Sequence, residues 1–402
     1  MHSGNEGKPK PMRVGSGGSA SASTGDAERV REALALDRRS ALWTGHARLG
    51  GILPKARQQN EDPWAVLRGR QYPSGGGRTD GGLVRAIGRK HSDARPRFDE
   101  EIAPGGYGWW YVDALSADGR HGLTIIAFIG SVFSPYYKRS GRGDPENHSS
   151  INVALYGPKA RWTMTERPRG SVARDEDNLQ IGPSHLRWAG DHLEIGIVER
   201  DKRLFNPFRR RVRGTVRVYP EIANPTAFAL DPGQSHIWHC LSPRARVEVE
   251  MSEPDIVWSG EAYLDSNFGS ESLEEGFRVW HWSRAHIGQD AMVCYEGIRR
   301  DGSGFASAIR FGENGSTDQV ELPMVAPLPN SLWQITRRTR SDNGHAKVLT
   351  TWEDTPFYAR STLASRINGE DVIAVQESLD MDRFASGLVQ FMLPYRMPRA
   401  KR

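Results

Sequence analysis

Two short segments of the sequence place an aromatic side chain two residues away from a group that can transfer a proton. One is His236-Ile-Trp238 and the other is Tyr263-Leu-Asp265. Successive side chains of a strand point to opposite faces, so each pair shares one face if its segment is extended. A carboxyl or imidazole group beside aromatic rings suits acid catalysis in an apolar pocket. The candidate catalytic residues are therefore Asp265, His236, Tyr263 and Trp238.

Asp265 also has a purely structural interpretation. It begins the segment Asp265-Ser-Asn-Phe-Gly269, and an aspartate in such a position can close an Asx turn with its own backbone. The spacing alone leaves the catalytic and the turn interpretations open.

The densest aromatic cluster of the chain is Trp109-Trp-Tyr-Val-Asp113. On a strand, Trp109, Tyr111 and Asp113 share one face, and Trp110 and Val112 share the other. Such clusters usually fill the core of a barrel. Because a cavity for an apolar ligand needs the same kind of wall, Trp109, Trp110 and Tyr111 are the candidate substrate-binding residues.

Other ligand sites have weaker support in the sequence. His236, His239 and Cys240 lie close together, but residues three apart point to opposite faces of a strand, and no second Cys/His pair has ligand spacing. Gly75-Gly-Gly77 lacks the Lys-Ser/Thr of a phosphate-binding loop. We therefore expect neither a metal nor a cofactor.

The elements that must position these residues are short strands. From Gly105 onward, runs of alternating apolar and polar residues are separated by turn signals such as Asp118-Gly119 and Asn314-Gly315, which indicates antiparallel β structure. One late segment, 381–389, favours a helix. The predicted fold class is all-β, with two barrels or sandwiches in tandem. The predicted strands are 108–115, 121–133, 151–156, 192–198, 212–218, 247–251, 255–265, 277–283, 291–300, 305–311, 319–322, 332–337, 347–351 and 372–377.

The charge is divided unequally between a tail and a body. Residues 1–97 contain 18 Lys/Arg and 9 Asp/Glu, whereas the remainder contains 36 and 40. The tail is rich in Gly and Ser and poor in aromatic residues, so we expect most of it to be disordered. Within it, residues 26–49 have apolar residues at helical spacing among arginines. This segment is either solvated or an anchor to anionic lipid headgroups.

Several classes of protein are excluded or disfavoured. The longest apolar stretch, 122–133, is shorter than the about 20 residues that a membrane-spanning helix needs. No secretory signal is visible and only Cys240 and Cys294 are present, so we expect a cytoplasmic location and reduced thiols. The basic run Arg209-Arg-Arg-Val-Arg213 lies in a net negative body without a nucleic-acid module, so we expect a solvated edge or a headgroup contact and no nucleic-acid partner.

Several segments together resemble the carotenoid 1,2-hydratases, also called hydroxyneurosporene synthases. The resemblance runs from about Phe98 to Arg399. The segments are Ala103-Pro-Gly-Gly-Tyr-Gly-Trp-Trp-Tyr-Val-Asp-Ala-Leu115, Gly122-Leu-Thr-Ile-Ile-Ala-Phe-Ile-Gly-Ser-Val-Phe-Ser-Pro-Tyr-Tyr137, Ile151-Asn-Val-Ala-Leu-Tyr-Gly157, Arg213-Gly-Thr-Val216, Tyr263-Leu-Asp-Ser-Asn267 and Met392-Leu-Pro-Tyr-Arg-Met-Pro-Arg399.

The resemblance implies a tandem lipocalin-like architecture: a tail at 1–97, a first β domain at 98–275 that carries the site, and a second at 276–402. It also implies that water is added to the terminal C1=C2 bond of acyclic carotenes such as neurosporene or lycopene, without a redox cofactor. The family's site residues correspond to His236, Trp238, Tyr263 and Asp265. Since the enzymes of this family belong to photosynthetic bacteria and use a membrane-soluble substrate, we expect peripheral contact with the inner, photosynthetic membrane.

Two other functions fit the same pattern. A lipocalin-like carrier would bind a carotenoid or another lipid without catalysis, and a related isomerase or cyclase would use the same acid without adding water. A carrier has no use for a buried protonatable group, which is costly to bury. Whether the carboxyl group of Asp265 is buried and protonated therefore distinguishes an enzyme from a carrier.

Overall fold

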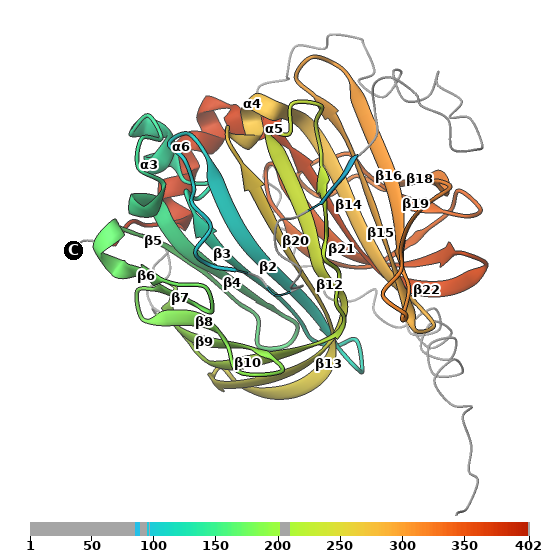
Figure 1. Ribbon diagram of the computed structural model, residues 1–402, viewed down its shortest axis with the longest axis horizontal. Coiled ribbons are helices and arrows are strands. Elements are labelled where there is room, and N and C mark those ends of the chain that lie inside the picture. The colour runs from blue at the N-terminus through green and yellow to red at the C-terminus, as the bar shows by residue number, and fades with distance from the viewer. Residues whose placement is uncertain (1–84, 89–94, 96, 202–209, 401–402) are drawn as a thin grey trace, which may run out of the picture.

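The computed structural model describes residues 85–88, 95, 97–201 and 210–400, and antiparallel strands dominate it (Figure 1). Two large sheets follow each other along the chain. The first ends at Gly269 and the second begins at Phe277. The predicted all-β fold class with two successive β units is confirmed.

The first sheet has the strand order β5-β4-β3-β2-β13-β12-β10-β9-β8-β7-β6, and β1 and β11 extend it beside β12. It curls, so that β4 and β5 approach β7 and β9, and its inner face is filled by aliphatic residues such as Ile125, Val153 and Ile195. Its strands are β1 Arg85–Gly88, β2 Tyr107–Ser116, β3 Gly122–Ile129, β4 Ser149–Tyr156, β5 Arg161–Arg167, β6 Val172–Arg174, β7 Asn178–Ile181, β8 Ser184–Trp188, β9 Leu193–Arg200, β10 Arg211–Ile222, β11 Thr226–Ala229, β12 His236–Glu253 and β13 Asp255–Gly269.

The second sheet has the order β17-β16-β15-β14-β22-β21-β20. A separate hairpin of β18 and β19 packs on it, with β19 in contact with β14, β21 and β22. The strands are β14 Phe277–Ile287, β15 Asp290–Arg299, β16 Gly304–Phe311, β17 Thr317–Val320, β18 Met324–Leu328, β19 Arg337–Ser341, β20 Lys347–Asp354, β21 Tyr358–Ile367 and β22 Glu370–Asp380.

One predicted strand, 332–337, is wrong. Only Arg337 of this segment is in a strand, because the backbone N–H of Leu332 donates to the carboxylate of Asp354 (2.6 Å) instead of to a neighbouring strand. The predicted helix at 381–389 exists as two helices, α5 and α6. Ser386 separates them with an extended backbone, and its hydroxyl caps α6 by accepting from the N–H of Val389.

The short helices lie along one edge of the molecule (Figure 1). They are α3 Pro135–Arg139, α4 Leu273–Gly276, α5 Met381–Ala385 and α6 Gly387–Arg396, and two 3₁₀ turns lie at Pro145–His148 and Arg169–Ser171. Helix α6 contacts both α3, which belongs to the first β unit, and α5, which follows the second sheet. The chain after the last strand therefore returns to the first unit.

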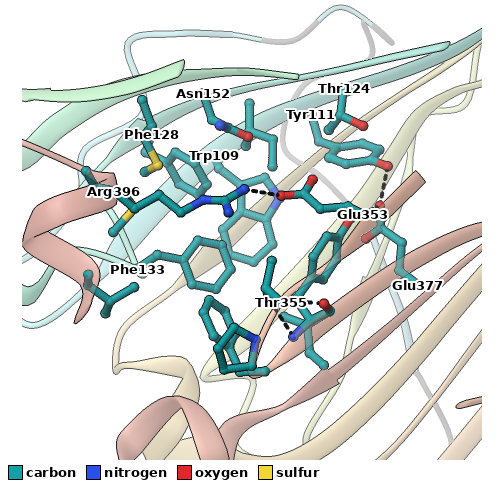
Figure 2. Close-up of a pocket in the computed structure, with 18 of the residues that line it drawn as sticks. Trp109, Tyr111, Thr124, Phe128, Phe133, Asn152, Glu353, Thr355, Glu377 and Arg396 are labelled. Carbon is teal, nitrogen blue, oxygen red and sulfur yellow. Dashed lines mark hydrogen bonds and ion pairs between the residues drawn. The ribbon is translucent and has the colours of Figure 1, made fainter. Parts of the chain in front are cut away.

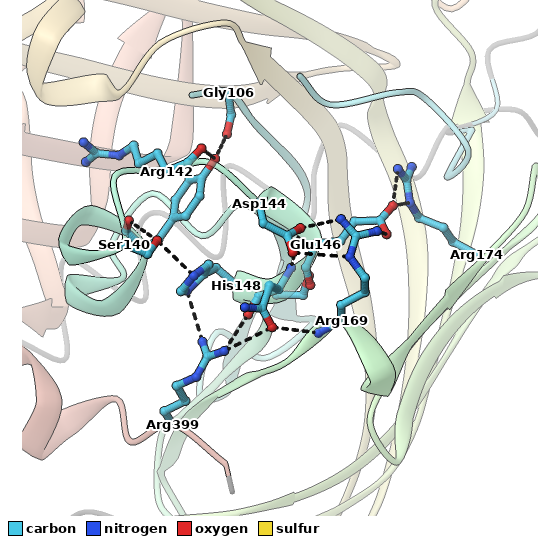
Figure 3. Close-up of polar contacts among 12 residues, drawn as sticks. Gly106, Ser140, Arg142, Asp144, Glu146, His148, Arg169, Arg174 and Arg399 are labelled. Carbon is cyan, nitrogen blue, oxygen red and sulfur yellow. Dashed lines mark hydrogen bonds and ion pairs between the residues drawn. The ribbon is translucent and has the colours of Figure 1, made fainter. Parts of the chain in front are cut away.

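An ionic cluster fastens this returning segment to the first sheet (Figure 3). The backbone of Arg399 pairs with that of Glu166 of β5 in a single β-bridge. The guanidinium group of Arg399 contacts the Glu166 carboxylate and the carbonyl oxygen of Asn147 (2.9 Å). The Nδ1 atom of His148 lies 2.9 Å from the same carboxylate, which is almost completely buried. These contacts hold the chain on the C-terminal side of α6 in place.

The segment predicted as a tail contains one strand that was not expected. Residues Arg85–Gly88 form β1 and pair with β11 over four residues. The basic segment 26–49 and Arg209 of the basic run lie outside the described residues, whereas Arg211 and Arg213 begin β10.

We predict that a chain lacking residues 1–84 folds, because the removed segment is poor in aromatic residues and lacks the strand pattern of the body. Its melting temperature should lie within about 3 °C of that of the full chain, which corresponds to roughly 1 kcal/mol. A longer truncation, through residue 90, also removes β1 and should melt lower. Circular dichroism during heating measures both, and a failure of the shorter truncation to fold would contradict the prediction.

Candidate active site

A cavity lies between the two sheets, with α6 along one side (Figure 2). It encloses about 1400 Å³ of empty space, part of it open to solvent. Its wall is rich in aromatic residues, which come from both β units: Trp109, Tyr111, Phe128, Phe133, Trp162, Trp280, Trp282, Tyr295, Trp333, Phe357 and Tyr358. The sequence led us to expect a site carried by residues 98–275, but residues of the second sheet complete it.

Asp265 is buried at this cavity, on the long strand β13. Its Oδ2 atom accepts hydrogen bonds from the hydroxyl of Tyr263 (2.8 Å) and from Nε1 of Trp238 (3.0 Å). Three of the four predicted catalytic residues therefore meet at one carboxyl oxygen. Because β13 continues without a bend to Gly269, the Asx-turn interpretation of Asp265 is wrong.

Burial raises the pKa of Asp265 to about 8, although the hydrogen bonds from Tyr263 and Trp238 oppose the shift. The negative charges of Glu377 and Asp113 raise it further. The carboxyl group is thus mainly protonated at pH 7. Since Oδ2 accepts two hydrogen bonds and Oδ1 accepts only a long one from Nδ2 of Asn267 (3.4 Å), we place the proton on Oδ1.

This pKa shift predicts a pH-dependent difference in stability between the protein and its Asp265→Asn variant. Between pH 4 and pH 8 the folded protein keeps this proton while the unfolded chain has lost it, so the stability contributed by the protonated carboxyl falls as the pH rises. The variant has no such group. Its free energy of unfolding should therefore rise relative to that of the native protein as the pH increases from 4 to 8. Urea denaturation of both proteins at several pH values measures the difference, and a constant difference would contradict the shift.

Tyr263 and Trp238 hold the acid and do not line the cavity themselves. The ring of Tyr263 packs against Trp282 at a centroid distance of 5.0 Å, and Trp238 packs against Tyr295 at 5.3 Å. Both predicted aromatic residues are therefore fixed between the acid on one side and rings of the second sheet on the other.

His236 lies apart from Asp265. Its Nδ1 atom is 2.9 Å from the hydroxyl of Tyr107, and its Nε2 atom is 3.1 Å from the carboxylate of Glu271. Burial lowers the pKa of His236, although Asp231 and Glu271 oppose this shift. The Tyr107 ring stacks on Trp109, which lines the cavity, with a centroid distance of 4.9 Å. His236 therefore reaches the cavity indirectly, through Tyr107 and Trp109 on one side and through Phe277 and Trp280 on the other.

The candidate substrate-binding residues divide between two cores. Trp109 and Tyr111 line the cavity, as expected for one face of β2. Trp110 points the other way and packs against Phe98 (5.2 Å between ring centroids) and Phe268 (5.7 Å) in the core of the first sheet. The alternation of side chains along a strand makes this outcome unavoidable, so the expectation for Trp110 is corrected.

The site contains charged residues that were not singled out in the sequence. Glu377 of β22 lines the cavity and contacts Arg360 of β21. Arg360 also donates to Asp113 of β2 (2.8 Å), and Asp113 accepts from Arg284 of β14 (2.7 Å). One signal was present: Glu377 ends the apolar run Val372-Ile-Ala-Val-Gln-Glu377 within a predicted strand. Arg360 lies on β21, which the sequence did not predict.

Burial alone would raise the pKa of Asp113, but Arg284 and Arg360 hold it below the usual value. Asp113 is therefore ionised and unsuited to donate a proton. Among the described residues, no group of three His, Cys, Asp or Glu side chains is arranged to hold a metal ion. The expected independence of metals remains a prediction.

Two successive antiparallel β units that enclose an aromatic-rich cavity, with a carboxyl group of raised pKa at its wall, define an all-β protein that carries an acid in an apolar site. The family model "Carotenoid hydratase CrtC" matches residues 125–402. The chain belongs to this family.

Similar proteins with a known name include two acyclic carotenoid 1,2-hydratases. The one from Thiocapsa roseopersicina is 46% identical over 380 residues, which cover 93% of each chain. The one from Rubrivivax gelatinosus is 45% identical over 389 residues, covering 94% of this chain and 95% of the relative. Both matches extend into the first 97 residues, for which the sequence resemblance offered no counterpart. Among solved structures, kievitone hydratase from Nectria haematococca is 11% identical with a TM-score of 0.45, over 75% of this chain and 98% of that one.

Proposed function

We propose that this protein is an acyclic carotenoid 1,2-hydratase, which adds water to the terminal C1=C2 double bond of a carotene such as neurosporene or lycopene. The observation that carries the proposal is the protonated carboxyl group of Asp265 at an aromatic cavity. The two relatives named as acyclic carotenoid 1,2-hydratases support the choice of substrate class.

Asp265 is the proposed acid. Transfer of its proton to C2 leaves a tertiary cation at C1, which water captures to give the 1-hydroxy carotenoid. The rings of Trp109, Trp282 and Tyr295 line the cavity and can face this cation, with each suitable ring contributing about 0.5 to 2 kcal/mol. Tyr263 and Trp238 position the acid, and His236 supports the stack that ends at Trp109. Addition of water transfers no net electrons, so the proposed reaction requires no redox cofactor.

The noncatalytic carrier and the isomerase or cyclase remain the rival functions. The buried acid favours an enzyme over a carrier, because a carboxyl group that burial keeps protonated is costly and adds nothing to the binding of a hydrocarbon. Incubation of the purified protein with lycopene separates the three. A product heavier by one water supports hydration, an isomer of unchanged mass supports the isomerase or cyclase, and bound but unchanged lycopene supports the carrier.

Peripheral contact with a membrane is part of the proposal, because a carotene resides in the bilayer. No helix of the described residues is long and apolar enough to span a membrane. Helix α6 turns Val389 and Leu393 toward the cavity, whereas Leu388, Phe391 and Tyr395 are exposed. The sequence from 387 to 402 contains four basic residues and no acidic one, and two of them, Arg396 and Arg399, pair with Glu353 and Glu166. The outer face of α6 is therefore the proposed contact with anionic lipid, next to the cavity that the substrate must enter.

We predict that the protein floats with anionic liposomes and that added salt weakens this binding. Phe391→Glu should lower the bound fraction about tenfold or more, since a buried phenylalanine contributes about 1.5 to 3 kcal/mol. Val257→Glu is the matched control, because Val257 is also an exposed apolar residue but belongs to strand β13 instead of helix α6. Equal flotation of the two variants would contradict the assignment of α6.

A further inference from the structure

Four carboxyl groups line the cavity, and their hydrogen bonds differ. Besides Asp265, they are Glu353, Asp354 and Glu377. Both oxygens of Glu353 are occupied, one by Arg396 (2.9 Å) and the other by the hydroxyl of Tyr156 (3.0 Å). Asp354 accepts backbone N–H groups through Oδ2, and its Oδ1 is shut off from solvent. Neither group is placed to bind a reacting water.

Glu377 is held at one oxygen only. Its Oε1 accepts hydrogen bonds from the hydroxyl of Tyr111 (2.7 Å; Figure 2), from that of Tyr358 (2.9 Å) and from Arg360. No hydrogen bond from a described residue ends on Oε2. The side chain is 12% exposed, and the cavity is the space that it lines. The carboxylate is therefore fixed in orientation and keeps one oxygen for a water molecule.

The charges around Glu377 favour its ionised form. Arg360 is buried between Asp113 and Glu377 and contacts both carboxylates, while Arg284 contacts the other oxygen of Asp113. Burial keeps the pKa of Glu377 above its usual value, with a further contribution from Asp113, while Arg360 and the hydroxyls of Tyr111 and Tyr358 limit the rise. Asp265 has no cation among its hydrogen-bond partners in the described chain. Of the two carboxyl groups, Asp265 and Glu377, it is therefore Asp265 that keeps the proton.

The two carboxyl groups share one wall of aromatic rings. Tyr263 donates to Asp265 and Tyr111 donates to Glu377, and the two rings lie 6.1 Å apart between centroids. Trp282 contacts both rings, at 5.0 and 5.9 Å. Asp265 comes from the first sheet and Glu377 from the second, so a substrate end in the cavity meets a protonated carboxyl and a carboxylate together.

We propose that Glu377 is the base that orients and deprotonates the attacking water, while Asp265 is the acid; this inference rests on the proposed hydration. Asp265 gives its proton to C2 and becomes a carboxylate. As the water oxygen bonds to C1, one of its protons passes to Oε2 of Glu377. The product is the tertiary alcohol, and a proton then moves through solvent from Glu377 to Asp265, which restores both groups. Separation of acid and base by their surroundings is the usual arrangement for such chemistry.

The test compares two reactions of lycopene in deuterium oxide. Protonation followed by loss of a hydron returns the alkene, with deuterium in the recovered carotene, and needs only the acid. Capture by water gives the alcohol and needs the base as well. Glu377→Gln should lower alcohol formation by about 10²-fold or more, the typical contribution of a general base, while deuterium still enters the recovered lycopene.

Two further variants complete the experiment. Glu377→Asp keeps the negative charge beside Arg360 but withdraws the carboxylate from the cavity, so it should fold and lose at least about tenfold in the ratio of alcohol to deuterated lycopene. Glu248→Gln makes the same chemical change in an exposed ion pair with Arg246 of β12, outside the cavity, so it should keep the native ratio. If Glu377→Gln fails to fold, Glu377→Asp decides the result.

A native ratio in the Glu377 variants would overturn the proposal, as would an equal loss of exchange and hydration in a variant with native melting. If the native protein itself forms neither alcohol nor deuterated lycopene, the proposed function fails, and that failure is visible before any variant is compared.

Discussion

Asp265→Asn is expected to abolish hydration while carotene binding remains nearly intact. The amide keeps the shape of the carboxyl group and can still accept hydrogen bonds from Tyr263 and Trp238, but it cannot donate a proton to carbon. General acids typically contribute about 10²- to 10⁴-fold. The loss should exceed this range, because water at neutral pH is a very poor acid toward an alkene.

Tyr263→Phe is the informative companion variant. It removes one of the two hydrogen bonds to Oδ2 of Asp265 but leaves the acid and the ring that packs on Trp282. Its turnover should fall less than that of Asp265→Asn. Turnover in deuterium oxide, carotene binding and thermal melting are measured on both variants. If Asp265→Asn kept substantial turnover with deuterium at C2, Asp265 would not be the acid.

The stronger parts of the sequence prediction rest on the alternation of side chains along strands. Alternation placed Trp109 and Tyr111 on one face of β2 and Tyr263 and Asp265 on one face of β13, and the structure has both pairs at the cavity wall or directly behind it. Such an argument needs only neighbouring residues. The register of the sheet is also a local property of its turns and hydrophobic pattern.

The same argument could not place His236. Cys240 is the residue of β12 opposite Asp265, so Trp238 is two residues away along the strand and His236 is four. Four residues of strand span about 13 Å, which puts the imidazole beyond contact with the acid. A shared face is therefore necessary for contact but not sufficient, and the register between β12 and β13 decides which residue of a pair reaches its partner.

The contribution of the second sheet was also out of reach. Tyr111 and Glu377 are 266 residues apart in sequence, and their contact depends on how the two sheets pack. No pattern within either strand specifies that packing. The sequence could therefore indicate the acid, but not the charged network or the position of the cavity between the sheets.

The packing of the two sheets also predicts a large loss of stability when a buried charge between them is removed. Asp113 of the first sheet is completely buried and receives hydrogen bonds from Arg284 (2.7 Å) and Arg360 (2.8 Å), both of the second sheet. Asp113→Asn removes the carboxylate that Arg284 contacts and leaves Arg360 with Glu377. Loss of one partner from a buried ion pair typically costs about 3 to 5 kcal/mol, so we expect the free energy of unfolding to fall by that amount.

Asp371→Asn is the matched control, because it makes the same chemical change in an ion pair with Arg366 that is largely exposed. Exposed pairs contribute about 0 to 1 kcal/mol, so this variant should unfold almost like the native protein. Urea denaturation at pH 7 measures both. If the two variants lost equally little stability, the buried charges would not hold the sheets together. The aromatic contacts between the sheets, such as those of Trp109 with Trp280 and of Tyr111 with Trp282, would then have to supply that stability.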